Sequence, residues 1–323
     1  MPPFRFGLVG LGRHGTRYAT HLLAQDVPGA SLAAVCRRDA AAARAFAASR
    51  GIIAHTDPDL LFADPSVDAI VLAVPPNLHP ALVPAALAAG KPVLVEKPLA
   101  TDTEGARTIL AAARGASSPL MVAHTLRFDT VVQTLRASLS AIGPLTLLTL
   151  DQMAEPSDQA WGDAPGVGGA LVNIGVHGFD LVRFLTGQEV VEVVCRTARA
   201  QSMQTEDTFA ALLTLSGPPG LAVVVDSRAA GGRSGRIVAV GQTGQLAGDF
   251  SAGTLTLIRG RERRPVPLPL SAPTVREVLR AFVQALQEGE PVPVPAEEGY
   301  RAVAVAGACA RSAAEGRPVR LSC

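Results

Sequence analysis

The sequence predicts an α/β protein in two parts: an N-terminal doubly wound parallel sheet, then an α+β domain with a large mixed or antiparallel open sheet. In the first third of the chain, short β-branched runs alternate with helical patterns, and parallel strands need crossovers of that length. After residue 123, strand-like stretches follow one another closely between glycine- or proline-rich turns, which is typical of antiparallel pairing. We therefore expect domains at 1–123 and 124–323.

The first domain should contain five strands joined by four helices. Strands are predicted at 4–10, 31–36, 69–74, 92–96 and 119–124, and helices at 13–24, 39–49, 78–89 and 102–114. In the second domain a helix is predicted at 129–140, a strand at 146–150 and a helix at 173–185. Six strands should follow between 190 and 260, and two helices, 274–288 and 298–314, close the chain.

The composition narrows the class of protein. A chain of 323 residues is long enough for about two domains with their own cores. Its 29 Lys and Arg residues balance 28 Asp and Glu, so neither nucleic acid nor a membrane surface is expected as a partner. No apolar run approaches the ~18 residues of a spanning helix, and the N-terminus lacks an export pattern. Four scattered cysteines favour a reduced, cytoplasmic protein without a metal site.

A glycine-rich turn follows the first strand. In GLVGLGRHG, Gly10 would permit the tight turn, Gly12 would let a pyrophosphate approach the backbone, and Gly15 would let helix and strand pack closely. The phosphates would rest on the amides of the helix start, beside Arg13 and His14. A tight turn without a ligand is the alternative, but the strand–turn–helix context favours a dinucleotide-binding Rossmann fold.

The end of the second strand bears on the choice of cofactor. An acidic residue there would bind the free ribose 2′-hydroxyl of NAD, whereas this strand ends in Cys36, Arg37 and Arg38. Arginine suits the 2′-phosphate of NADP, with Arg13 as a second contact, and Arg38 could stack on adenine. Solvated arginines are the alternative. NAD stays possible, because Asp39 could reach the ribose if the register shifts by one residue.

Polar residues also follow the next two strands. Pro75, Asn77 and His79 in VPPNLHP should lie near the middle of the cofactor, and Asn77 suits the cap of the following helix. A histidine bonded to backbone is an equally good reading of His79. Glu96 and Lys97, stopped by a proline, stand where the strand 92–96 ends, at the edge where open α/β sheets bind ligands.

Together with the glycine loop, two further segments resemble the Gfo/Idh/MocA oxidoreductases, which include sugar and cyclitol dehydrogenases and glucose–fructose oxidoreductase. These segments are VPPNLHPALVPAALAAGKPVLVEKPLA at 74–100 and GGALVNIGVHGFDLVRFLTG at 168–187. The resemblance spans nearly the whole chain. It implies that Lys97 lies beside the reacting carbon and acts as the principal acid and base, and that Glu96 contacts the nicotinamide ribose. It also implies a possible cis bond between Lys97 and Pro98.

In the second domain, Asn173, His177 and Asp180 should share one helical face beside Gly168 and Gly169. The resemblance implies that His177 binds the substrate hydroxyl and assists Lys97. It places two further residues, Arg127 and Trp161, near the substrate, although a surface ion pair and a core aromatic are ordinary alternatives for them. Many family members have aspartate at position 173, and asparagine there contributes no charge.

The first hypothesis is an NAD(P)-dependent oxidoreductase, NADP-preferring, that moves hydride between the nicotinamide and a carbinol or carbonyl carbon of a sugar or cyclitol. A cofactor- or sugar-sensing regulator and an NAD-dependent glycoside hydrolase are the alternatives that the resemblance leaves open. Apolar strands at 190–200 and 220–230 have few helices to cover them, which predicts a homodimer or homotetramer formed through the C-terminal sheet.

Overall fold

The computed structural model describes residues 2–156, 160–202 and 204–321. Contacts along the chain divide it into two compact units. Unit 1 comprises residues 1–125 and 273–300, and unit 2 comprises residues 126–272 and 301–323. The segment 273–300 therefore belongs with the N-terminal sheet, although it follows the second sheet in the sequence. No helix in the described ranges is long and apolar enough to cross a membrane.

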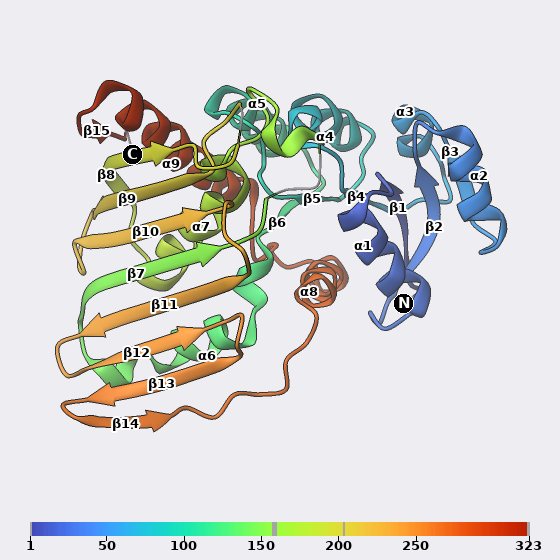
Figure 1. Cartoon of the computed structure of the whole chain (residues 1–323). Helices are drawn as coiled ribbons and strands as arrows, with labels where there is room; N and C mark the ends of the chain where they lie inside the picture. Colours follow the sequence, from blue (N-terminus) through green and yellow to red (C-terminus); the bar gives the residue numbers. More distant parts are fainter. Residues whose placement is uncertain (1, 157–159, 203, 322–323) are drawn as a thin grey trace. The chain divides into compact units, whose positions relative to one another are not determined.

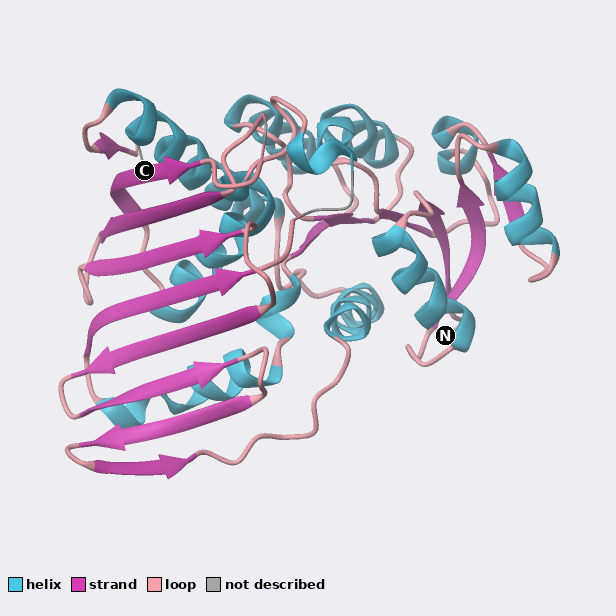
Figure 2. Ribbon diagram, viewed as in Figure 1, coloured by secondary structure: helices cyan, strands magenta, loops and turns pink. Residues whose placement is uncertain are grey.

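Unit 1 is built on a parallel sheet of six strands in the order β3-β2-β1-β4-β5-β6 (Figures 1 and 2). Its strands are β1 Phe4–Val9, β2 Ala30–Cys36, β3 Ile53–His55, β4 Ala69–Leu72, β5 Val93–Glu96 and β6 Leu120–Ala123. Its helices are α1 Arg13–Ala24, α2 Ala40–Ala48, α3 Pro58–Phe62, α4 His79–Ala88, α5 Thr103–Gly115 and α8 Thr274–Glu288, with the 3₁₀ turn η1 Pro76–Leu78. This strand order is that of a Rossmann fold, as predicted, with the switch point between β1 and β4.

Two elements of unit 1 were not predicted, β3 and α3. β3 has only three residues and lies at the edge of the sheet, where its side chains are partly exposed. α3 is a five-residue helix that depends on local chemistry, because the Asp57 carboxylate caps it and Pro58 occupies its first turn. Neither element is long enough to produce a periodic pattern.

Unit 2 contains a mixed sheet of nine strands in the order β14-β13-β12-β11-β7-β10-β9-β8-β15. Its strands are β7 Leu145–Met153, β8 Val190–Ala198, β9 Thr208–Leu215, β10 Leu221–Ser227, β11 Ser234–Gly241, β12 Gly244–Asp249, β13 Thr254–Arg259, β14 Glu262–Pro265 and β15 Val319–Arg320. All neighbours are antiparallel except β7 and β10, whose carboxyl ends lie together. The parallel pairing of β7 with β10 makes this a mixed sheet, which agrees with the prediction.

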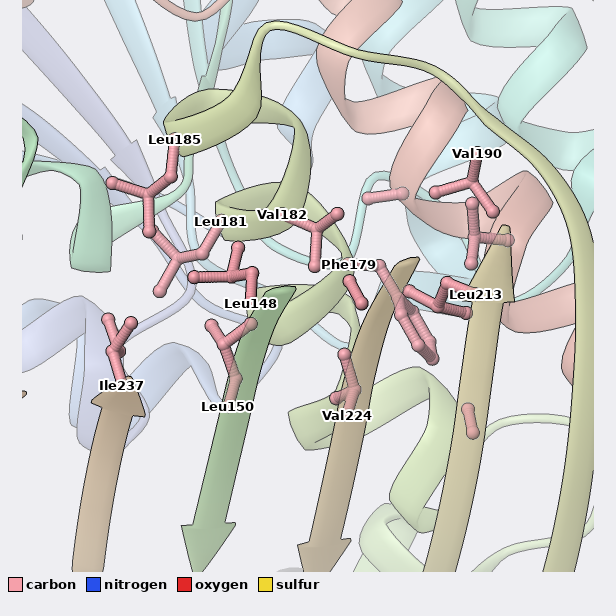
Figure 3. Packing of buried hydrophobic residues seen from close by; sticks show 14 of the residues in the cluster. Leu148, Leu150, Phe179, Leu181, Val182, Leu185, Val190, Leu213, Val224 and Ile237 are labelled. Carbon is pink, nitrogen blue, oxygen red and sulfur yellow. The ribbon is translucent and has the colours of Figure 1, made fainter. Parts of the chain in front are cut away.

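Helices cover one face of this sheet. They are α6 Thr130–Ser138, α7 Val176–Thr186 and α9 Ala296–Glu315, and α9 continues from unit 1 into unit 2. Figure 3 shows Phe179, Leu181 and Val182 of α7 above the strand residues Leu148 and Val224. All five side chains are fully buried, and burying each contributes about 1.5–3 kcal/mol. α7 approaches closely because a Cβ at Gly178 would lie 2.6 Å from Val224 Cγ1.

The opposite face of the sheet carries a row of apolar and small side chains. Cross-strand partners link the row over seven strands: Val194, Leu212, Val223, Thr149, Val238, Ala247 and Thr256. Val194 is 36% exposed and Leu212 is 43% exposed, and Leu221 beside them is 44% exposed. The neighbouring row contains the ion pair of Arg236 with Asp151, at 2.9 Å. We refer to the first row as the open-face row.

Candidate functional site

The glycine loop has the sterics that a dinucleotide cradle requires. Gly10 has a φ of 95°, and a Cβ there would lie 2.3 Å from the carbonyl oxygen of Ala73. A Cβ at Gly15 would lie 1.9 Å from the Gly10 oxygen, so both positions need glycine. Beside Gly12 no atom lies within 4 Å of a built Cβ, and no side chain caps the start of α1. The loop therefore fits a pyrophosphate on the first amides of α1.

At the end of β2 both predicted arginines, Arg37 and Arg38, are exposed. The Arg37 amide donates to the His55 carbonyl at 3.1 Å, which fixes the backbone beside β3. Asp39 is the N-cap of α2, and its Oδ1 accepts from the Ala42 amide at 3.0 Å. A ribose contact through Asp39 would compete with this cap, whereas the two guanidinium groups extend into solvent.

Glu96 and Lys97, at the end of β5, differ in burial. Glu96 is 6% exposed, and its Oε1 accepts a hydrogen bond of 2.8 Å from the hydroxyl of Tyr18 on α1. Its Oε2 accepts from the Lys97 amide at 3.1 Å. Lys97 is half-buried, and the Lys97–Pro98 peptide bond is cis, as the resemblance implied. The His14 ring lies 3.9 Å from Glu96 Oε1, and burial lowers the pKa of this imidazole.

His79 is fully buried and faces three backbone carbonyls. Its Nδ1 lies 3.1 Å from Pro98 O and 3.2 Å from Leu99 O, and its Nε2 lies 3.2 Å from Val74 O. Burial lowers the pKa of His79 to about 4, so the ring is neutral at neutral pH and donates one proton. Because a neutral imidazole has a single N–H, it hydrogen-bonds either the segment after Lys97 through Nδ1 or the Val74 carbonyl through Nε2, depending on the tautomer.

The prediction that Asn77 caps the following helix is wrong. Asn77 lies within η1 and is exposed, and no side chain caps α4. The 3₁₀ turn η1 runs directly into α4, so the backbone continues where a capping side chain would otherwise act. Pro75, half-buried, stands immediately before η1.

In unit 2, the two glycines Gly168 and Gly169 lead into a wide turn. A Cβ at Gly168 would lie 2.2 Å from Gly162 O, and one at Gly169 would lie 2.4 Å from Glu206 Oε1. Glu206 Oε1 accepts from the Leu171 amide at 3.1 Å, and burial raises the pKa of this carboxyl group. The turn Leu171–Gly175 (η5) is a π-helix, so the helix predicted from 173 begins two residues earlier and with wider geometry. Such turns are frequent at functional sites.

The predicted substrate residues Asn173 and His177 belong to this helix. Asn173 lies in η5, and its amide donates to Gly169 O at 3.0 Å. His177 lies in the first turn of α7, and both side chains are half-buried. Trp161 lies in the 3₁₀ turn η4, Ala160–Asp163, and is half-buried. Gly168 passes next to this turn, because a Cβ there would lie 2.8 Å from Trp161 O.

Arg127 is neither exposed nor in a surface ion pair. It lies in the 3₁₀ turn η2, Thr125–Phe128, is 6% exposed, and pairs with Asp180 of α7 through two hydrogen bonds. The surface ion pair considered from the sequence is therefore replaced by a buried one.

Sequence reasoning missed three polar residues: Tyr18, Glu206 and Asp226. Asp226 of β10 is fully buried next to Gln152 of β7, and burial raises the pKa of Asp226 well above its ordinary value. Asp226 could have been found from the alternation of β10, which places it on the same face as Val224. The partners of Tyr18 and Glu206 lie too far away in sequence for any local pattern. In the described ranges, no cluster of three or more His, Cys, Asp or Glu could hold a metal ion.

A Rossmann sheet with a dinucleotide cradle and an acid–amine pair at its carboxyl edge defines an NAD(P)-binding oxidoreductase. The chain belongs to the Gfo/Idh/MocA family. The family's NAD-binding Rossmann fold matches residues 4–124, and its C-terminal alpha/beta domain matches residues 140–321.

Similar proteins span the same length. Inositol 2-dehydrogenase 1 of Saccharopolyspora erythraea is 33% identical over 329 residues, covering 98% of this chain and 96% of that protein. Inositol 2-dehydrogenase 2 of the same organism is 34% identical, covering 96% and 93%. Among solved structures, a putative myo-inositol dehydrogenase from Sinorhizobium meliloti has a TM-score of 0.84 and 26% identity, covering 99% of this chain and 100% of its own.

Proposed function

We propose that this oxidoreductase acts on a secondary hydroxyl of a cyclitol or a closely related sugar. The observation that carries the proposal is that the loop of Gly10, Gly12 and Gly15 follows β1, while Glu96 and Lys97 stand at the end of β5 in the same parallel sheet. The similarity to two inositol 2-dehydrogenases at 33% and 34% identity supports a cyclitol as substrate class.

The proposed chemistry gives each candidate residue a separate role. A bound nicotinamide accepts or returns the hydride. In unit 1, Lys97 takes the hydroxyl proton during oxidation and gives it back during reduction, which is typically worth ~10²–10⁴ in rate. In unit 2, His177 binds the reacting hydroxyl, and Asn173, Arg127 and Trp161 are the further residues proposed to shape the substrate site.

For the cofactor we propose a preference for NADP over NAD. The exposed guanidinium groups of Arg37 and Arg38 support it, because they suit a 2′-phosphate. The use of Asp39 as a helix cap supports it further, since that carboxylate is engaged with Ala42. Arg13, His14, Pro75, Asn77 and His79 are the remaining proposed cofactor neighbours.

We also propose that two copies associate through the open-face row, in a homodimer or homotetramer located in the cytoplasm. The row joins seven strands with apolar or small side chains, and Leu212 near one end is 43% exposed. An apolar sheet face of this extent is a typical contact surface between identical subunits. A monomeric mass by light scattering at micromolar concentration would rule this out, and Leu212→Arg should dissociate the assembly.

The test of the activity is a screen of myo-inositol, its stereoisomers and common aldoses against NAD and NADP, following reduced cofactor by absorbance. We expect turnover with at least one cyclitol and a higher kcat/KM with NADP. Turnover with aldoses alone would overturn the substrate class. Cofactor binding without turnover would favour the sensing alternative.

A further inference from the structure

Tyr18 is a buried residue of α1 whose hydroxyl is hydrogen-bonded to Glu96, at the end of β5. It lies on the face of α1 that also carries Gly15, one turn after the glycine loop, and its side chain is fully buried. Its hydroxyl donates to Glu96 Oε1 at 2.8 Å across 78 residues of sequence. Burial and the charge of Glu96 raise the pKa of Tyr18 well above its ordinary value. The hydroxyl therefore stays protonated and acts as a donor.

The Glu96 carboxylate also contacts the backbone of Lys97. A carboxylate that is 6% exposed needs donors, because a buried and unsatisfied charge is costly. The Tyr18 hydroxyl is one such donor. The second oxygen accepts from the Lys97 amide at 3.1 Å, so one carboxylate bridges the Tyr18 ring and the backbone of Lys97. The His14 nitrogen, at 3.9 Å, is too distant for a hydrogen bond.

We propose that Tyr18 is a positioning residue that fixes Lys97 through the Glu96 carboxylate. Without its hydroxyl, Glu96 would turn toward another donor and release the Lys97 amide. The backbone that carries the amine would then lose one of its restraints. This inference rests on the proposed role of Lys97, but the contact itself can be tested without it.

The direct test is hydrogen exchange at the Lys97 amide in the cofactor-free full chain. In Tyr18→Phe, which keeps the ring, exchange at Lys97 should become about ten-fold faster or more, while the Leu94 amide of β5 is unchanged. Tyr300→Phe, at the chain's other tyrosine, is the matched control and should alter neither amide. In a Glu96→Ala background, Tyr18→Phe should have no further effect on Lys97. Unchanged exchange at Lys97, or an equal rise at Leu94, would overturn the inference.

Kinetics separate this inference from the proposed function. With NADP and myo-inositol as probes, Tyr18→Phe should lower kcat by about 10- to 100-fold, since small misplacements of a reacting group are costly. The dissociation constant of NADP should change less than the turnover number. If Lys97→Ala retains full turnover, the proposed function fails while the exchange result still decides the role of Tyr18. If Lys97→Ala is inactive but Tyr18→Phe matches the wild type, the function stands and the inference fails.

Discussion

The guanidinium of Arg127 and the carboxylate of Asp180 are joined by two parallel hydrogen bonds. Nε lies 2.8 Å from Oδ2 and Nη2 lies 2.6 Å from Oδ1, and both side chains are buried. The guanidinium also lies 5.0 Å from the centre of the Phe184 ring. Asp180 follows His177 by three positions on α7, so the pair fixes the helix that presents this histidine. Any contact of Arg127 with substrate would be additional to this role.

Breaking the pair should be costly, because each partner alone becomes an uncompensated buried charge. We expect Asp180→Ala or Arg127→Ala to lower the free energy of unfolding by about 3–5 kcal/mol. The double variant Arg127→Met/Asp180→Leu should lose less than either single variant. Urea unfolding followed by the fluorescence of Trp161 in unit 2 would measure these free energies. The control is Arg320→Met, which removes an exposed ion pair with Glu192 and should change the free energy of unfolding little. Additive losses would contradict the coupling.

Lys97→Ala should lower kcat by ~10²–10⁴ and leave the affinity for cofactor nearly unchanged. The reason is that the proposed mechanism gives the proton transfer to the amine and the binding of the pyrophosphate to the glycine loop. Lys91→Ala is a matched control at the chain's other lysine, whose Nζ donates to the Asp64 carbonyl at 3.1 Å. Steady-state rates and a cofactor titration would measure both effects. Near-normal turnover in Lys97→Ala would remove it from the chemistry.

Arg37→Asp should shift the preference from NADP toward NAD. In the proposed cofactor site the new carboxylate would repel the 2′-phosphate of NADP and accept a hydrogen bond from the ribose hydroxyl of NAD. Because charged hydrogen bonds are worth about 1.5–3 kcal/mol, the ratio of kcat/KM values should change by roughly ten-fold or more. The control Arg107→Asp makes the same charge change on the exposed side of α5. An unaltered ratio would place Arg37 outside the site.

Asn173→Asp tests the departure from the acidic residue common in the family. A negative charge there would stabilise the protonated forms of His177 and Lys97, so both would lose their protons at higher pH. Because oxidation needs the deprotonated base, its rate in the natural protein should reach its plateau at lower pH than in the variant. The profile of kcat/KM against pH, with the same alcohol, would measure the displacement. If the basic limb of this profile stays in place or moves to lower pH in the variant, position 173 is not electrostatically coupled to His177 and Lys97.

His79 should make the protein acid-sensitive. Its pKa is lowered to about 4 in the folded chain, against an ordinary value of 6.5, so between these values only the unfolded chain binds the proton. Stability is thus full above about pH 6.5 and falls as pH decreases toward 4, by about 3 kcal/mol from this group. His79→Asn should be less stable at neutral pH but should lose less on acidification. Equal losses in both proteins, by thermal unfolding across this range, would contradict the assignment.

Local sequence patterns predicted the helices that are determined by their own amphipathic period and end signals. The bounds of α1 and α8, 13–24 and 274–288, agree with the prediction because both helices have an amphipathic period and clear ends. The contacts in the site that escaped prediction join residues far apart in the sequence. Glu206 meets the amide of Leu171 from 35 positions away, and Asp180 meets Arg127 from 53. Hydrophobic periodicity contains no information on which polar groups meet across such distances, so it could not have revealed these contacts.

The two ends of the nine-stranded sheet decide how the molecule can associate. β14 has four exposed residues, Glu262, Arg263, Arg264 and Pro265, and β15 on the other side has only two residues. Charge, proline and shortness are the features by which sheets prevent a foreign strand from adding to an edge. Growth of one sheet into the next, which would produce fibres without limit, is therefore opposed at both ends. Contact between sheet faces remains open, and an isologous contact of that kind closes on itself and yields particles of fixed size.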